Sequence, residues 1–412
     1  MRALWLTSSY PRDPSDASGV FLHTWARALV SRGMEIRVIA PGAPGVAGRE
    51  ELDGVEVIRF PYYFPRSKQR LAYRNEGFLG GLQADRWSRV QIVPFLANFA
   101  RYAWREARDA DLIHAFWTPM GAIGLLVRLL RVRPLVLSPL GSDLRFLPDV
   151  FNRTVIGLSQ AVVAGGDQCT EVYDRLIGMM REAPYPIFLP IDEPQLDAGD
   201  GDAFRREQGI KDERVVTFVG RLCEGKDPLT FLRAAPFLLS HRPGIRFVMV
   251  GGGPLLSALR ATRAELGLER EVIFTGVRRD IGSILKASDV FVSLSPESNC
   301  WSTTIAEAMH MGVPCVVSDT GLERRLFPHR EAAWLVPPRD PQALAGALDC
   351  VLGDVKVSKQ LSEGGRDLLQ THRRKDDLIL QDTMDMYESV IRAHGSAPRL
   401  LTARGFRSWT DE

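Results

Sequence analysis

Two positively charged residues, Arg221 and Lys226, stand five positions apart in the stretch TFVGRLCEGKDPLTF. The apolar run before Arg221 predicts a buried strand, so both cations belong to the turn at its carboxyl end. A solvated basic turn is the ordinary interpretation of such a pair. The alternative is that both charges face an anionic ligand. The neighbouring residues indicate which interpretation is correct.

Glycines at predicted strand ends favour the anionic ligand. Gly220 ends the strand before Arg221, and Gly252 and Gly253 end the next strand, before Pro254 opens a helix. In open α/β sheets the ligand lies beyond the carboxyl ends of the strands. Glycine at these points lets a ligand approach the backbone closely.

A second anion-binding element is the start of a later helix, at Ser302, Thr303 and Thr304. Its free backbone N–H groups and the positive end of its dipole attract a phosphate. Such donors are most important for a diphosphate leaving group, because negative charge builds on it as the bond to the transferred group breaks. Glu307, one helical turn further, suits ribose hydroxyls as a hydrogen-bond acceptor. An ordinary surface carboxylate is the alternative for Glu307.

The elements that hold these residues alternate between strands and helices. In the first 40 residues an apolar strand, a helix ending at Gly33 and a second strand form a β-α-β unit, which predicts parallel pairing. Six apolar runs separated by helical stretches follow the joint near residues 190–203. Two doubly wound, Rossmann-like domains in series are therefore predicted. The stretch between 60 and 108 has no clean period and is interpreted as an excursion from the first sheet.

Composition narrows the class of protein. The chain has 412 residues and a formal net charge of +2, which argues against a dedicated nucleic-acid binder. No apolar run reaches the roughly 18 residues that span a bilayer, and the N-terminus lacks the features of a signal peptide. The five cysteines are scattered without a C-x-x-C pair, so we expect a reduced, cytoplasmic protein without a zinc site.

Three motifs of the second half resemble those of the GT4-type retaining glycosyltransferases of the GT-B fold. They are FVGRLCEGKDP, VMVGGGP and TTIAEAMHMGVPCVVSDTG. The opening SSYPRDPSDASGVFLHTWARALVSRG resembles the acceptor loop and first helix of this family, and the similarity extends to about residue 392. The implied fold is two Rossmann-like domains facing a central cleft.

The resemblance also implies domain boundaries and roles. Residues 1–192 would bind the acceptor, 193–375 the nucleotide sugar, and a helix at about 376–394 would complete the first domain, with 395–412 as a tail. Gly19 matches the loop near the diphosphate and the acceptor. Glu307 matches the second glutamate of the E-x7-E motif, which binds ribose. No metal is required, since Arg221 and Lys226 would take the role that a cation plays elsewhere.

Two positions depart from the family pattern. The first glutamate of E-x7-E is replaced by Asn299, which can hydrogen-bond a sugar hydroxyl but carries no charge, and Glu297 would substitute only in a rearranged loop. The segment that often reads His-Gly-Ser-Asp is Leu140-Gly141-Ser142-Asp143 here. Gly141, Ser142 and Asp143 are the acceptor-site candidates, although Asp143 could equally cap a helix.

His114 ends another strand of the first half and is a candidate catalytic residue together with Arg221, Lys226 and Asn299. A structural histidine bonded to a loop carbonyl is the alternative. The expected reaction moves a sugar from a UDP- or GDP-linked donor to a hydroxyl of a glycan, lipid-linked glycan or small molecule, with retention at the anomeric carbon. The acceptor would attack from the face that the diphosphate leaves.

Two other functions are alternatives to this reaction. A non-catalytic sugar-nucleotide-binding or partner-binding protein on the same fold would explain Asn299 and Leu140. A nicotinamide-dependent dehydrogenase is disfavoured because G-x-G-x-x-G is absent. Basic and aromatic residues of the 62–89 segment could meet an anionic membrane at its inner face or a lipid-linked acceptor, and a solvated insertion is the alternative. They are Tyr62, Tyr63, Phe64, Arg66, Lys68, Arg70, Tyr73, Arg74, Arg86, Trp87 and Arg89.

Overall fold

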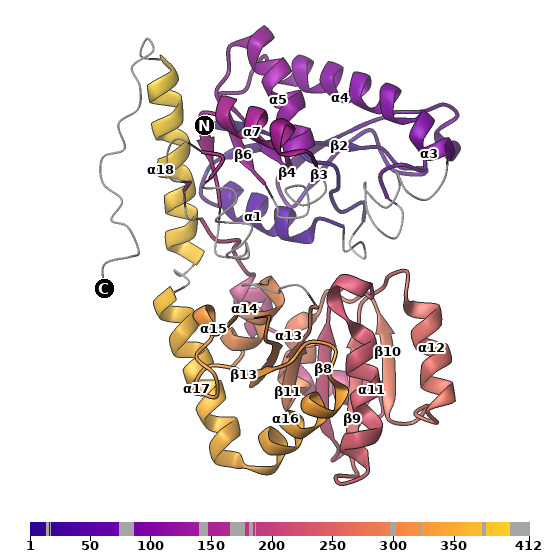
Figure 1. The fold of residues 1–412 in the computed structure, drawn as a ribbon. Helices are drawn as coiled ribbons and strands as arrows, with labels where there is room; N and C mark the ends of the chain where they lie inside the picture. The colour runs from indigo at the N-terminus through magenta and orange to yellow at the C-terminus, as the bar shows by residue number, and fades with distance from the viewer. Residues whose placement is uncertain are drawn as a thin grey trace.

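The computed structural model describes two α/β domains, each built on its own sheet (Figure 1). The residues described are 1–13, 16, 18–73, 86–139, 147–164, 178–180, 184–185, 187–296, 302–320, 323–372 and 376–395. Among them, no helix is both long enough and apolar enough to cross a membrane.

The first sheet has the strand order β3-β4-β2-β1-β5-β6-β7. All neighbouring strands are parallel except β3, which pairs antiparallel with β4. The chain order reverses between β1 and β5, so these two strands flank the point where ligands bind in open sheets. The strands are β1 (Arg2–Leu6), β2 (Glu35–Pro41), β3 (Arg49–Leu52), β4 (Val55–Phe60), β5 (Leu112–Phe116), β6 (Leu135–Ser138) and β7 (Ala161–Val162).

Helices cover both faces of this sheet, because successive strand residues point to opposite sides. Leu4 and Leu6 of β1 join one core with α4, α5 and α7, whereas Ala3 and Trp5 join a second core with α1. The segment between 60 and 108, expected to leave the sheet, carries η1, α3 and α4. The helices are α1 (Val20–Val30), η1 (Arg66–Lys68), α3 (Arg86–Val90), α4 (Ile92–Glu106), α5 (Thr118–Arg131) and α7 (Asp149–Leu158).

The second sheet is parallel throughout, with the order β10-β9-β8-β11-β12-β13. Its chain order reverses between β8 and β11, as in dinucleotide-binding sheets. The strands are β8 (Arg214–Val219), β9 (Ile245–Val250), β10 (Val272–Gly276), β11 (Val290–Ser293), β12 (Cys315–Ser318) and β13 (Trp334–Val336). These are the six apolar runs of the sequence.

Helices of the second domain pack on both faces of this sheet. They are α9 (Glu193–Asp197), α10 (Gly201–Glu207), η2 (Glu224–Lys226), α11 (Pro228–Leu239), α12 (Leu256–Glu265), α13 (Ile281–Ala287), α14 (Thr303–His310), α15 (Glu323–Leu326), α16 (Pro341–Gly353) and α17 (Val355–His372).

The last helix, α18 (Asp376–Gly395), returns to the first domain, where Figure 1 shows it beside the N-terminus. Ile379, Met386 and Tyr387 are buried in the same core as Ala3 and Trp5 of β1. The chain therefore crosses between the domains twice, once near Asp192 and once before Asp376. Arg27 of α1 pairs with Asp192, and Arg32, two residues after the end of α1, pairs with Asp377 beside the second crossing.

The carboxyl edges of the two sheets face each other. Arg279, three residues after β10, donates from Nη2 to the backbone oxygens of Asp13 (3.2 Å) and Asp16 (3.1 Å), in the loop that follows β1. Both partners lie beyond the ends of their strands, so loops of one ligand-binding edge contact loops of the other. The predicted arrangement of two facing Rossmann-like domains is confirmed.

Candidate functional site

At the reversal point of the second sheet, the two strands that lead to the predicted donor residues lie side by side. β8 and β11 are hydrogen-bonded neighbours, with Val292 opposite Phe218. Gly220 and Arg221 follow β8 directly, and the chain after β11 leads to α14 and its N-cap Ser302. Parallel strands end at the same edge of a sheet. The turn after β8 and the start of α14 therefore share the location where such sheets bind phosphates.

The glycine run after β9 is packed against the turn after β8. A Cβ on Gly251 would lie 1.9 Å from the backbone oxygen of Gly220, and one on Gly253 would lie 2.4 Å from that of Leu222. Leu222 N–H also donates to Gly252 O at 3.0 Å. Only glycine fits this contact, so the glycines shape the backbone that presents Arg221.

The two cations occupy different environments. Arg221 is exposed, whereas Lys226 is half-buried at the end of η2. Asp227 then adopts a left-handed conformation (φ 43°), and its Oδ1 accepts from Thr230 N–H at the start of α11. This N-cap fixes the end of the turn, so Lys226 is held beside the first turn of α11.

The start of α14 has the expected form. Ser302 is the N-cap, and its Oγ accepts from Ile305 N–H at 3.3 Å and shares a hydrogen bond with Thr304 Oγ1 at 3.0 Å. Thr303, Thr304 and Glu307 are all half-buried, whereas Ile305 is buried in the core. Spacings of three and four residues place Thr303, Thr304 and Glu307 on one side of the helix.

In the first domain, Gly19 closes the loop after β1. Its φ of 71° is left-handed, and a Cβ there would lie 2.6 Å from Ser9 O. Asp16 organises the loop by accepting from the N–H groups of Arg12 and Ser18, both at 3.0 Å. Burial acts to raise the pKa of Asp16, but hydrogen bonds from Arg12 and Ser18 outweigh it and lower that pKa. The carboxylate therefore stays ionised and keeps the loop in shape.

Two family models match the chain. Residues 213–354 match the model described as Glycosyl transferases group 1, and residues 17–178 match the Glycosyl transferase 4-like domain. The chain is 33% identical to a D-inositol 3-phosphate glycosyltransferase of Corynebacterium urealyticum, over 82% of this chain and 83% of that protein. The chain belongs to the GT4-type glycosyltransferases.

Two further comparisons extend this result. The chain is 34% identical to the UDP-Gal:alpha-D-GlcNAc-diphosphoundecaprenol alpha-1,3-galactosyltransferase of Escherichia coli, over 40% of this chain and only 43% of that protein. The crystal structure of HepE from Anabaena in complex with UDP-glucose superposes with a TM-score of 0.71, over 94% of this chain and 100% of HepE. HepE is 20% identical to this chain, so this likeness shows the GT-B fold alone.

His114 is not placed for catalysis in this glycosyltransferase. Its side chain is fully buried, its Nδ1 shares a hydrogen bond with the Tyr387 hydroxyl of α18, and its Nε2 shares one with Ser138 Oγ at 2.8 Å. Burial lowers its pKa to about 3. With both ring nitrogens engaged and no exposed atom, the structural alternative is favoured, although the partner is a helix side chain rather than a loop carbonyl.

Several predicted site residues lie outside the described part of the chain. Asn299 and Glu297 fall in the segment before Ser302. The acceptor-site candidates Gly141, Ser142 and Asp143, together with Leu140, fall between β6 and α7. Their roles stay predictions.

Two candidates escaped the sequence analysis. Trp117, directly after β5 at the reversal point of the first sheet, has φ 69° and ψ 144°, a strained conformation for a residue other than glycine. Its ring meets Phe21 edge to face at 6.4 Å between centroids. Arg279 bridges the domains, as described above. Neither backbone strain nor a contact between domains leaves a local sequence pattern.

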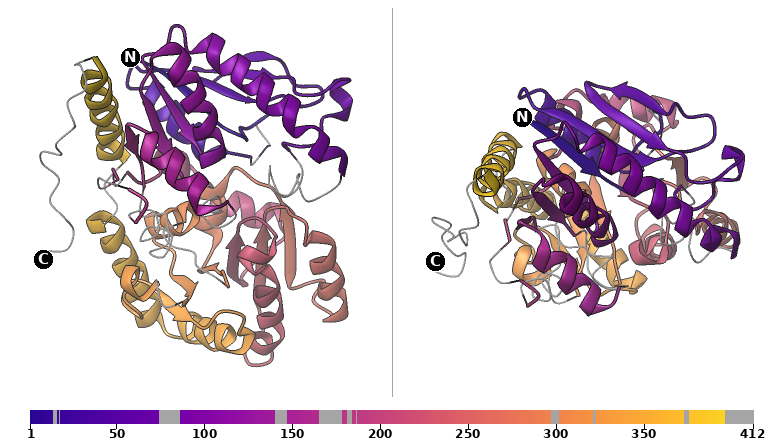
Figure 2. Two further views of the ribbon diagram at one scale, coloured as in Figure 1. Left: turned by 45° about the horizontal axis from the view of Figure 1, so that its top comes forward. Right: turned by 90° about the horizontal axis from the view of Figure 1, so that it is seen from above.

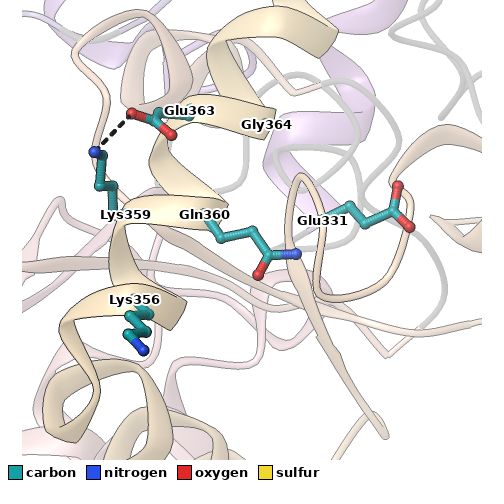
Figure 3. Close-up of a pocket in the computed structure, with 6 residues that line it drawn as sticks. All are labelled: Glu331, Lys356, Lys359, Gln360, Glu363 and Gly364. Atoms are coloured by element: carbon teal, nitrogen blue, oxygen red, sulfur yellow. Dashed lines mark ion pairs between the residues drawn. The ribbon is translucent and has the colours of Figure 1, made fainter.

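A pocket of about 420 Å³ is lined by residues of α17 and by Glu331, which precedes β13, and by none of the predicted donor residues (Figure 3). Lys359 pairs with Glu363 there, at 3.6 Å. Within the described residues, no group of three or more His, Cys, Asp or Glu side chains could hold a metal ion.

Proposed function

We propose that this glycosyltransferase moves a sugar from a nucleotide-diphosphate donor to a hydroxyl of a glycan or lipid-linked glycan, with retention at the anomeric carbon. The observation that carries the proposal is the pairing of β8 with β11, because β8 leads into the Arg221–Lys226 turn and β11 leads towards the start of α14 at the same edge of the sheet. Two cations and a helix N-terminus suit a diphosphate, because its negative charge is shared among several oxygens. Charged side chains and backbone N–H groups can each donate to these oxygens.

The proposed reaction needs no protein nucleophile. The bond between the anomeric carbon and the diphosphate oxygen breaks, and Arg221, Lys226 and the α14 N–H groups stabilise the charge on the leaving diphosphate. The acceptor oxygen bonds to the anomeric carbon from the same face, and its proton passes to a leaving phosphate oxygen. Glu307 accepts from ribose hydroxyls, and Asn299 hydrogen-bonds the sugar. Turnover is expected to survive EDTA, since the two cations replace a metal.

The named relatives support the choice of substrates. HepE was crystallised with UDP-glucose, and the Escherichia coli relative acts from UDP-Gal on a diphosphoundecaprenol-linked sugar. A UDP-sugar donor is therefore the first choice and a GDP-sugar the second. A cytoplasmic location, with a peripheral contact at the inner face of the membrane, would bring the enzyme to such an acceptor.

A donor screen tests the proposal. Nucleotide release is measured across UDP- and GDP-sugars, with and without lipid extracts as acceptor. We expect one donor to give acceptor-dependent release and a product whose anomeric proton coupling matches that of the donor. A product of opposite configuration would refute retention. Binding of a sugar nucleotide without turnover on any acceptor would refute catalysis.

A further inference from the structure

Positive charge is concentrated in two segments of the first domain. Residues 86–108 and 118–133 contain eight arginines and a single acidic residue, Glu106, whereas the whole chain has a net charge of only +2. Glu106 is buried and pairs with Arg37 at 3.0 Å. The two segments therefore carry a positive net charge, and the remainder of the chain is net negative.

Large apolar side chains share this surface. The inner side of α4 packs into the core through Phe95, Phe99 and Ala103. The outward side chains of α3 and α4 include further apolar residues that are not part of the core. They are Trp87, Val90, Val93, Leu96 and Trp104, all exposed.

The end of α5 joins this surface to a second apolar group. Arg131 stacks over the Trp104 ring at 4.0 Å and donates from Nε to Trp104 O at 2.9 Å. Leu129 and Leu130 directly precede Arg131 and are 79% and 60% exposed. Figures 1 and 2 show α4 and α5 side by side on the side of the first domain that faces away from the second. We call the outward side chains of α3, α4 and residues 129–133 the α4–α5 face.

Val132 gives an independent sign that this face has a function. It ends α5 in a left-handed conformation (φ 53°, ψ 52°) and is 69% exposed. Helices usually place glycine or asparagine at such a position, because a branched side chain is strained there. An exposed, strained valine adds nothing to the core. A branched apolar side chain at this exposed position would be favourable if it were buried in an apolar environment outside the protein.

We propose that the α4–α5 face docks the protein onto an anionic lipid bilayer. In the part of the chain that the structure describes, Arg101 and Arg131 of this face, and Arg108 just beyond the end of α4, have no carboxylate partner. Their charge is therefore available to lipid phosphates. Tryptophan and arginine suit the headgroup level, and the leucines and Val132 suit the acyl boundary. This inference rests on the peripheral membrane contact of the proposed function and assigns that contact to one face, and its test requires neither a donor nor an acceptor.

Electrostatics distinguishes the bilayer from a second copy of the chain. A two-fold dimer through this face would bring the same patch of each copy together. Two positive surfaces would then oppose each other. An anionic bilayer supplies the opposite charge together with an apolar interior, which matches both components of the face.

The test is cosedimentation of the full chain with phosphatidylcholine vesicles, with and without phosphatidylglycerol, at low and high salt. We expect binding that requires phosphatidylglycerol and weakens with salt. Replacing Arg101 by Gln should weaken binding about fivefold, since one cation at the surface contributes about that much. Arg260→Gln, at an exposed position of α12, is the matched control and should bind normally.

Val132→Asn separates docking from folding. Asparagine tolerates the left-handed conformation, so the variant should melt at a higher temperature than the parent. Its vesicle binding should fall about tenfold, because one buried valine side chain is lost. Val355→Asn, at a valine that is 78% exposed at the start of α17, should bind vesicles normally.

Three outcomes would overturn the proposal: no binding to anionic vesicles, equal loss in both valine variants, or self-association abolished by Val132→Asn in the absence of lipid. Titration of UDP-glucose in solution monitors the donor site separately. A variant that binds nucleotide but not vesicles therefore tests docking alone.

Discussion

At the scale of single residues, the proposed donor site relies on two cations with different surroundings. Replacing exposed Arg221 by Ala should leave the fold intact and lower kcat by about two to three orders of magnitude, because charge on the leaving diphosphate loses a donor. Lys226→Ala should act in the same direction. Steady-state kinetics with the donor found by the screen provide the measurement.

The matched control for the two cations is Arg233→Ala. Arg233 is an exposed arginine of α11 in the same domain, so its loss should leave kcat unchanged. Turnover near that of the parent in both Arg221→Ala and Lys226→Ala would end the assignment of these residues to the diphosphate.

His114 makes a prediction about stability rather than catalysis. Its pKa is about 3 in the folded protein, against 6.5 for an unperturbed histidine, because burial disfavours the imidazolium. Between these values the unfolded chain binds a proton that the folded chain does not. The free energy of unfolding should therefore fall as pH decreases from 6.5 towards 3, by up to about 1.4 kcal/mol per pH unit.

Urea unfolding at several pH values measures this contribution. His114→Gln should lower stability at pH 7 by about 1–3 kcal/mol, because Tyr387 and Ser138 lose a buried partner. The same variant should show a shallower decline towards acid than the parent. Identical pH slopes in the two proteins would contradict a neutral, buried His114.

At the scale of elements, the contact between the turns after β8 and β9 leaves no room for a methyl group. Gly253→Ala would place Cβ 2.4 Å from Leu222 O, so the backbone around Arg221 must move. We expect a large loss of nucleotide affinity with the rest of the fold retained. Calorimetric titration with the donor nucleotide provides the measurement.

Gly346→Ala, within α16, is the control for this prediction. Nothing lies within 4 Å of the added Cβ, and alanine favours a helix over glycine by about 1 kcal/mol. This variant should be slightly more stable and bind nucleotide normally. Equal affinity in the two variants would mean that the glycine contact does not shape the site.

At the scale of the whole molecule, Arg279 links the second domain to the loop after β1. Arg279→Ala removes its hydrogen bonds to Asp13 O and Asp16 O. Hydrogen exchange of the amides in residues 7–22 should accelerate in this variant, because the loop loses its contact with the opposite domain.

The neighbouring residue offers the control for Arg279. Arg278 pairs with Glu207 and Asp280 inside its own domain. Arg278→Ala should therefore accelerate exchange near α10 and leave residues 7–22 unchanged. Unaltered exchange of residues 7–22 in Arg279→Ala would show that the contact does not constrain the loop.

Local patterns in the sequence determined much of this protein. Short apolar runs bounded by glycine predicted the strands of the second domain, because strand periodicity and turn chemistry are local properties. Ser302, Thr303 and Thr304 predicted the start of α14 for the same reason, since an N-cap is made by residues three apart.

Only the tertiary structure decided which distant residues meet. The sequence predicted His114 at the end of a strand, but it is the middle residue of β5 and hydrogen-bonds Tyr387, 273 residues away. The backbone strain at Trp117 and Val132, the contact of Arg279 with the opposite domain, and the union of α4 with the end of α5 likewise arise from packing. Such contacts leave no spacing to detect, because the chain brings their members together only when its two sheets and their covering helices have formed.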